Sequence, residues 1–164
     1  MIRLAVAQQR DKELLWNINQ KYLYEMTNYY DNPMDANGNY HYGYFDKYFS
    51  DPKRTAYFLY DDDALIGFAF LHPYSCLAKT PDHTMAEFTI FPAYRRRHLA
   101  FDVATIILEK HPGQWEIKYN EKNIAAKRLW NKVAAPYSPE VVHLNNEETV
   151  LLFTKGAEQQ LPVR

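Results

Sequence analysis

Three consecutive arginines, Arg95, Arg96 and Arg97, follow an apolar segment that ends at Phe91 and precede an amphipathic segment that begins at Leu99. The apolar segment is typical of a strand and the amphipathic one of a helix. The first amides of a helix have no intrahelical partner, and the helix dipole is positive at that end. The junction therefore predicts a phosphate-binding site, with a solvated basic turn as the alternative.

A second candidate for chemistry is Glu87, which lies inside the otherwise apolar segment Thr84–Phe91. Glutamate is depleted in strands, and a carboxylate held there could act as a general base. The alternative is an edge or solvent-facing residue. His72 and His83 flank the loop before this segment and Cys76 lies within it, and for these three the ordinary structural roles are favoured.

Tyrosine is concentrated in one part of the chain. Eight of the 14 tyrosines fall between residues 22 and 48: Tyr22, Tyr24, Tyr29, Tyr30, Tyr40, Tyr42, Tyr44 and Tyr48. Aromatic walls suit an apolar or cationic amine, by stacking or by cation–π contact. The alternatives are a core beneath a long loop and a dimer interface; we expect most of these rings to be core and two or three, with Tyr22, Tyr29 and Tyr30 as the candidates, to face a substrate.

Composition limits the classes of protein that fit. The 164 residues carry 19 basic and 20 acidic side chains, a net charge of −1, which disfavours a general nucleic-acid binder. The single cysteine excludes an intrachain disulfide, and neither a signal peptide nor a membrane-spanning apolar run is evident. No metal-ligand spacing is present. We expect one cytoplasmic domain over residues 1–155, with a C-terminal tail over 156–164.

Hydrophobic periodicity and turn residues place the elements around these groups. We expect the following order, with strands at 2–7, 55–60, 64–72, 84–91, 115–119, 140–144 and 149–154, and helices at about 12–26, 45–49, 99–110 and 124–133. Asn123 is a favourable N-cap for the last of these helices, and the run His111-Pro112-Gly113 ends the helix before it. The segment 73–81 is expected to be a loop.

Two motifs in this order resemble those of the GNAT superfamily of N-acetyltransferases. The first, Arg95-Arg96-Arg97-His98-Leu99-Ala100, resembles the family's Gln/Arg-x-x-Gly-x-Gly/Ala and follows Pro92-x-Tyr94. The second, Asn123-Ile124-Ala125-Ala126-Lys127-Arg128-Leu129-Trp130, resembles Asn-x-x-Ala-x-x-Leu-Tyr. The run Pro112-Gly113-x-Trp115-Glu116 resembles one subgroup of predicted acetyltransferases. The resemblance implies an α/β (α+β) fold with a mixed, mostly antiparallel, twisted sheet of about 6–7 strands and about four helices.

The resemblance also implies acetyl-CoA as cosubstrate and a small-molecule or peptide amine as acceptor, with no membrane or nucleic-acid partner and with a possible homodimer. The residues it assigns to the cofactor are Phe88, Thr89, Ile90, Arg95, Arg96, Arg97, His98, Leu99, Ala100, Phe101, Asn123, Ala126, Lys127 and Trp130, with Arg128 as a further contact. The catalytic candidates are Glu87 as base, and Tyr119 and Tyr137 as weaker candidates for acid or for positioning.

Two positions depart from the family pattern. His98 stands where the family prefers glycine, which permits close approach of the backbone to phosphate. Trp130 stands where many members have a tyrosine acid, and indole cannot supply that proton. Core packing is the alternative role for Trp130. Both departures leave open a second hypothesis, a non-catalytic acyl-CoA-binding or interaction protein on the same fold; a nucleic-acid module that uses the three arginines is a third.

Overall fold

The described residues, 1–145 and 147–157, fold around one sheet in the computed structural model. The strands are β1 (Ile2–Val6), β2 (Thr55–Asp61), β3 (Ala64–His72), β4 (His83–Ile90), β5 (Gly113–Asn120), β6 (Glu140–His143) and β7 (Glu148–Lys155). The helices are α1 (Lys12–Met26), α2 (Lys47–Ser50), α3 (Leu99–Lys110) and α4 (Ile124–Ala134), and short 3-10 helices cover Gln9–Asp11, Pro92–Tyr94 and Ala135–Tyr137.

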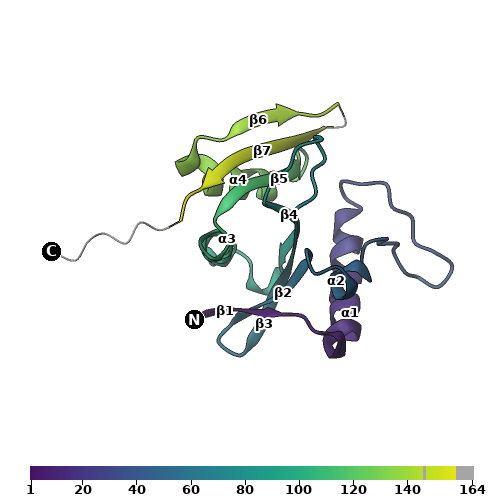
Figure 1. Cartoon of the computed structure of the whole chain (residues 1–164). Helices are drawn as coiled ribbons and strands as arrows, with labels where there is room; N and C mark the ends of the chain where they lie inside the picture. Colours follow the sequence, from purple (N-terminus) through teal and green to yellow (C-terminus); the bar gives the residue numbers. More distant parts are fainter. Residues whose placement is uncertain (146, 158–164) are drawn as a thin grey trace.

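The sheet has seven strands in the order β1-β2-β3-β4-β5-β7-β6. Every neighbouring pair is antiparallel except β4 and β5, which are parallel. In Figure 1, β4 runs between the half of the sheet formed by β1, β2 and β3 and the half formed by β5, β7 and β6. The mixed, mostly antiparallel sheet with four helices that the sequence predicts is thereby confirmed.

Two hydrophobic cores lie on opposite faces of the sheet. Phe68 and Phe70 of β3 pack in one core with residues of α1 and α2, such as Leu15 and Tyr48. The alternate β3 residues pack in the other core with residues of α3 and α4, such as Ile107. Because both faces of β3 are covered, this strand is apolar at nearly every position rather than alternating.

The ends of α3 and α4 follow the sequence signals closely, and three strands, β2, β5 and β7, are longer than expected. α3 ends at Lys110, before His111 and Pro112. The Asn123 side chain caps α4 by accepting a hydrogen bond of 3.2 Å from the Ala126 amide. β5 extends beyond the expected 115–119 to Gly113–Asn120, because β7 pairs with it over its full length. The helix expected at 45–49 spans Lys47–Ser50.

The single sheet contains every strand in the described part of the chain. The division into a domain over 1–155 and a tail over 156–164 stays a prediction, and residues 158–164 of that tail lie outside the described residues. Across residues 1–145 and 147–157, no helix has both the length and the apolar character needed to cross a membrane.

Candidate functional site

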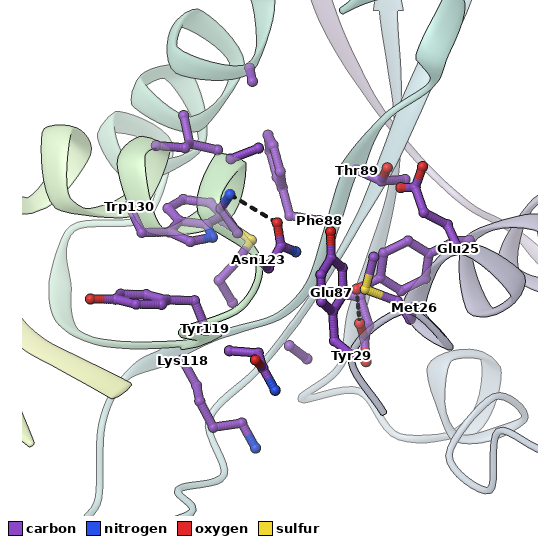
Figure 2. Close-up of a pocket in the computed structure, with 18 of the residues that line it drawn as sticks. Glu25, Met26, Tyr29, Glu87, Phe88, Thr89, Lys118, Tyr119, Asn123 and Trp130 are labelled. Carbon is purple, nitrogen blue, oxygen red and sulfur yellow. Dashed lines mark hydrogen bonds between the residues drawn. The ribbon is translucent and has the colours of Figure 1, made fainter. Parts of the chain in front are cut away.

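A cleft of about 1610 Å³ opens where β4 and β5 diverge. Its walls come from α1, the segment that follows α1, β4, the 94–100 segment, β5 and α4. Figure 2 shows Trp130 and Tyr119 on one side of the cleft and Glu87, Met26 and Tyr29 on the other. The volume suits a large substrate, since ordinary ligand pockets span roughly 300–1,000 Å³.

β4 and β5 diverge because they pair over only a short stretch. Within the described residues, the two strands pair only through His83–Met85 of β4 and Trp115–Ile117 of β5. On the other side, β3 pairs with β4 up to Ile90, with a bulge at Ala86, which bends the bulged strand. The edge of β4 that faces β5 therefore carries backbone groups open to a ligand from Glu87 to Ile90, except that the Ile90 carbonyl accepts a hydrogen bond from Arg95.

Glu87 lies at the start of this open edge. Its Oε2 accepts a short hydrogen bond from the Tyr22 hydroxyl of α1. Burial raises the pKa of Glu87 to about 7, while Tyr22, Lys118 and Tyr42 act to lower it. A carboxyl group with this pKa exchanges a proton readily near neutral pH, which is the property of a general base.

Tyr22 lines the cleft and also positions the Glu87 carboxylate through its hydroxyl group. Burial and the neighbouring Glu87 carboxylate raise the pKa of Tyr22 well above its usual value, so that the hydroxyl stays a donor. The Tyr22 ring packs edge-on against Phe68 at 5.3 Å. The packing fixes the ring, and the ring fixes the carboxylate.

The segment after α1 closes one end of the cleft. Tyr29 lines it, and the Tyr30 hydroxyl donates a hydrogen bond of 3.0 Å to Glu148 of β7. Lys118 of β5 forms an ion pair with the same Glu148 at 3.3 Å. The segment thus crosses from α1 to the far half of the sheet, and its Tyr29 and Tyr30 line the same cleft as Tyr22 of α1.

The backbone after Tyr94 turns sharply before α3. Arg96 and His98 both have positive φ, +66° and +59°, the left-handed conformation that favours glycine. His98 is the residue before the first turn of α3, and it lines the cleft together with Leu99 and Ala100 of that turn, where the first amides of a helix have no intrahelical partner. His98, which departs from the first motif at a glycine position, therefore has a backbone conformation that favours glycine.

Some basic residues near this turn line the cleft and others do not. Arg96 and His98 line the cleft, as does Arg128 of α4, while Arg97 lies outside it. Arg95 lines the cleft but its guanidinium faces Glu25 of α1, with two hydrogen bonds of 2.8 and 2.6 Å. The Nε of Arg95 also donates to the Ile90 carbonyl at 2.7 Å. Arg95 thus joins α1 to β4.

The α4 residues that the sequence assigns to the cofactor also divide. Asn123, Ala126 and Trp130 line the cleft, and Trp130 packs edge-on against Phe88 at 5.1 Å. Lys127 lies outside the cleft and forms an ion pair of 2.5 Å with Glu121.

The remaining candidates fall in and outside the cleft. Tyr119 lines it, and its hydroxyl accepts a hydrogen bond of 3.0 Å from Asn131. Tyr137 lies elsewhere, because its ring stacks on Phe153 at 5.2 Å in the core beside α3 and α4. Phe101 lies under the Lys132 ammonium, 4.4 Å from its ring centre. Among the apolar candidates, Leu99 and Ala100 line the cleft with Thr89 and Ile90.

Several cleft residues were not expected to act from the sequence. They are Tyr42, Lys118 and Glu116, and His72 and Cys76 also line the cleft. A polar residue at every second position of β5 was the available signal for Glu116 and Lys118, since side chains two apart share a face. His83 instead packs against Trp115, 5.0 Å between ring centres. In the described residues, no cluster of three or more metal-ligating side chains occurs.

Comparison with solved structures shows what this fold is similar to. A GNAT-family acetyltransferase from Bacillus cereus has a TM-score of 0.63 and 14% identity, covering 97% of this chain and 99% of that chain. The aminoglycoside acetyltransferase AAC(6')-Ib, in complex with coenzyme A and kanamycin, has a TM-score of 0.68 and 10% identity, covering 94% and 95%. The ribosomal-protein-S18-alanine N-acetyltransferase from Escherichia coli has a TM-score of 0.58 and 12% identity, covering 100% of both chains.

Comparison of the sequence with curated proteins gives no match. A family model described as "Acetyltransferase (GNAT) family" matches residues 15–134, which include the open edge of β4, the turn before α3 and all of α4. This match spans more than half of the chain. The protein therefore belongs to the acetyltransferase (GNAT) family.

Proposed function

We propose that this protein is an N-acetyltransferase that moves an acetyl group from acetyl-CoA directly to an amine of a small molecule or peptide. The observation that carries the proposal is the position of Glu87. This carboxyl group has a pKa near 7 and lies beside the open backbone edge of β4 in a cleft large enough for two substrates. A cytoplasmic location and a homodimer stay predictions.

The donor end of the cleft fits a thioester of coenzyme A. The open edge from Glu87 to Ile90 offers backbone amides and carbonyls to the amide groups of the pantetheine arm. Phe88, Ala126 and Trp130 form an apolar wall beside it. The first amides of α3 and the Arg96 and Arg128 side chains would hold the phosphates. In this assignment Arg95 positions the turn through Glu25 rather than binding phosphate itself.

Glu87 performs the proton transfer in this proposal. An amine attacks only when neutral, and Glu87, directly or through a water molecule, takes its proton. Acetyl-CoA supplies an activated acyl carbon, whose bond to sulfur breaks as its bond to nitrogen forms. A backbone amide of the open β4 edge would stabilise the charge on the carbonyl oxygen.

Many family members have a tyrosine that protonates the leaving thiolate. This protein has Trp130 at that position. Thiolate is a tolerable leaving group without a proton. Tyr119 is the other candidate, since its hydroxyl accepts from Asn131 and keeps its own proton available. We place Tyr137 outside the reaction because it stacks on Phe153.

The test combines binding with turnover. Calorimetric titration of acetyl-CoA is compared for the wild type, Glu87→Gln and Glu109→Gln, the last an exposed carboxylate of α3 outside the cleft. Thiol release is then followed with a panel of amines. We expect Glu87→Gln to bind acetyl-CoA normally and to lose about 100-fold or more in kcat, while Glu109→Gln behaves as wild type.

Two results would contradict the proposal. Unchanged turnover in Glu87→Gln with a true acceptor would remove Glu87 as the base. Normal binding of acetyl-CoA with no transfer to any amine would favour the alternative, a non-catalytic acyl-CoA-binding protein.

A further inference from the structure

The charged side chains that line the cleft separate into paired and unpaired groups. The paired ones are Arg95 with Glu25, Lys118 with Glu148, and Arg54 with Asp51. In the described part of the chain, four others make no ion pair. Arg96 and Arg128 lie at the donor end, where phosphates are expected, and Glu87 and Glu116 lie on β4 and β5. The cleft therefore has a cationic end and an anionic end.

Glu116 is the less accessible of the two carboxylates. Its side chain belongs to a residue that is 1% exposed. Its Oε1 accepts hydrogen bonds from the Cys76 amide at 3.2 Å and from the Cys76 thiol at 3.1 Å. Its Oε2 is buried and has no hydrogen-bond partner among the residues that the structure describes. A buried carboxylate oxygen without a partner is costly. Glu116 is part of the cleft wall, so a ligand gains that energy when the side chain turns toward the cleft and Oε2 accepts from it.

The neighbours of Glu116 do not neutralise it. Burial, followed by the positive charge of Arg54, lowers the pKa of His72 to about 4, so this imidazole is neutral near pH 7. Burial and Glu116 raise the pKa of the Cys76 thiol to about 11, so the thiol stays a donor. Lys118, on the same face of β5, is paired with Glu148. Glu116 therefore forms no ion pair within the described residues, although it lines the cleft.

Glu116 and Glu87 lie on neighbouring strands at different depths of the cleft. In the parallel register, Glu116 is opposite Thr84, and Glu87 is three residues further along β4. Because β4 bulges at Ala86, Thr84 and Glu87 pair with His72 and Phe70 of β3, which are two positions apart and correspond to roughly 7 Å. Tyr22, Tyr29 and Tyr42 also line the cleft near Glu87, and aromatic rings favour cations. The two carboxylates and the rings together suit a flexible ligand with two separated positive charges.

We propose that the acceptor is a diamine or polyamine that places one nitrogen at Glu87 and a second, protonated nitrogen at Glu116. This inference rests on the proposed acetyl transfer. The nitrogen at Glu87 gives one proton to that carboxylate and forms the bond to the acyl carbon as the bond to sulfur breaks. The second proton that this nitrogen loses goes to the thiolate of coenzyme A, which leaves as the thiol. The nitrogen at Glu116 keeps its protons and donates a charge-assisted hydrogen bond to Oε2. A monoamine would leave Oε2 without a partner.

The experiment measures kcat/KM for a series of linear α,ω-diamines and spermidine against monoamines of the same carbon chain. We expect the best diamine or spermidine to exceed its monoamine by about 100-fold, since a hydrogen bond to a charged group is worth up to about 3 kcal/mol. Glu116→Gln keeps the shape and the acceptor for Cys76 but removes the charge. It should lower the diamine kcat/KM about 10-fold to 100-fold, mainly through KM.

Two variants control this result. Glu116→Asp keeps the charge and should retain part of the preference, and Glu109→Gln on α3 removes a carboxylate outside the cleft and should retain all of it. Thermal unfolding of each variant separates loss of binding from loss of folding. Equal kcat/KM for diamines and monoamines, or an unchanged preference in a folded Glu116→Gln, would overturn this inference while acetyl transfer stands. Failure of transfer to every amine, although acetyl-CoA binds, would overturn both.

Discussion

The Tyr22 hydroxyl donates a hydrogen bond to Oε2 of Glu87, and this contact joins α1 to the open edge of β4 inside the cleft. Desolvation alone would favour the protonated carboxyl group, and Tyr22 opposes it by stabilising the ionised form. The balance leaves the pKa of Glu87 at about 7. The proton affinity of the proposed base is therefore set partly by a residue of the first helix, 65 positions away in sequence.

Tyr22→Phe should shift the acid limb of the pH profile to higher pH. Loss of the hydroxyl removes a group that lowers the pKa of Glu87, so the carboxylate needs a higher pH to lose its proton. A general base works only when deprotonated, so kcat/KM well below neutral pH should fall by about threefold to tenfold. At high pH the variant should approach the wild type. An acid limb at the same pH in both proteins would contradict this role of Tyr22.

Arg95 and Arg96 should respond differently to replacement by alanine, although they are adjacent. Arg95 pairs with Glu25 and donates to the Ile90 carbonyl, so Arg95→Ala should lower the free energy of unfolding by about 1 kcal/mol, the upper range for a partly exposed pair. Arg96 makes no ion pair among the described residues, so Arg96→Ala should leave the melting temperature unchanged and weaken acetyl-CoA binding about tenfold.

Thermal unfolding and calorimetric titration separate these two effects. Glu25→Gln is the matched control, because it breaks the same ion pair from the other side and should reproduce the loss of stability in Arg95→Ala. The loss of affinity in Arg96→Ala should shrink at high salt, where exposed charges are screened. A large loss of affinity for acetyl-CoA in Arg95→Ala, with normal stability, would mean that Arg95 itself binds phosphate.

The fold was largely predictable because its signals are local. The turn at His111-Pro112-Gly113, the cap at Asn123 and the alternation of apolar residues each act over a few positions, and the structure confirms the strand number and the helix number that they imply. Glu87 could be proposed as a site residue for the same reason, since a carboxylate in an apolar strand is a local anomaly, and the structure places it in the cleft.

The pairing of side chains within the cleft was not predictable in the same way. Arg95 and Glu25 are 70 positions apart, and Glu116 meets Cys76 across 40. Nothing in the local pattern says which charges a tertiary contact will neutralise. Lys127 shows the same limit, because its position in the second motif indicated the cofactor, whereas the structure pairs it with nearby Glu121 outside the cleft. Its contact with the cofactor stays a prediction.

His98 should be replaceable by glycine but not by valine. Its φ of +59° costs a residue with a side chain roughly 1 kcal/mol, and a β-branched residue more. His98→Gly should keep the turn before α3 and its affinity for acetyl-CoA within about threefold, whereas His98→Val should weaken binding about tenfold or more. Calorimetric titration checks both. Equal losses in the two variants would mean that the imidazole itself, rather than the backbone conformation, holds the phosphate.

Gly67→Ala should disturb the donor end of the cleft from the opposite side of β4. A Cβ at Gly67 of β3 would lie 2.0 Å from the Thr89 carbonyl oxygen, and backbone cannot move aside as a side chain can. The strands must separate at the point where β4 presents its open edge, which should cost about 1–3 kcal/mol of the free energy of unfolding and weaken acetyl-CoA binding. Gly43→Ala is the control, because its Cβ would meet only the His41 side chain, at 3.2 Å. Thermal unfolding and titration of both variants check the prediction, and a Gly67→Ala protein as stable as Gly43→Ala would show that the close approach of β3 and β4 is not required.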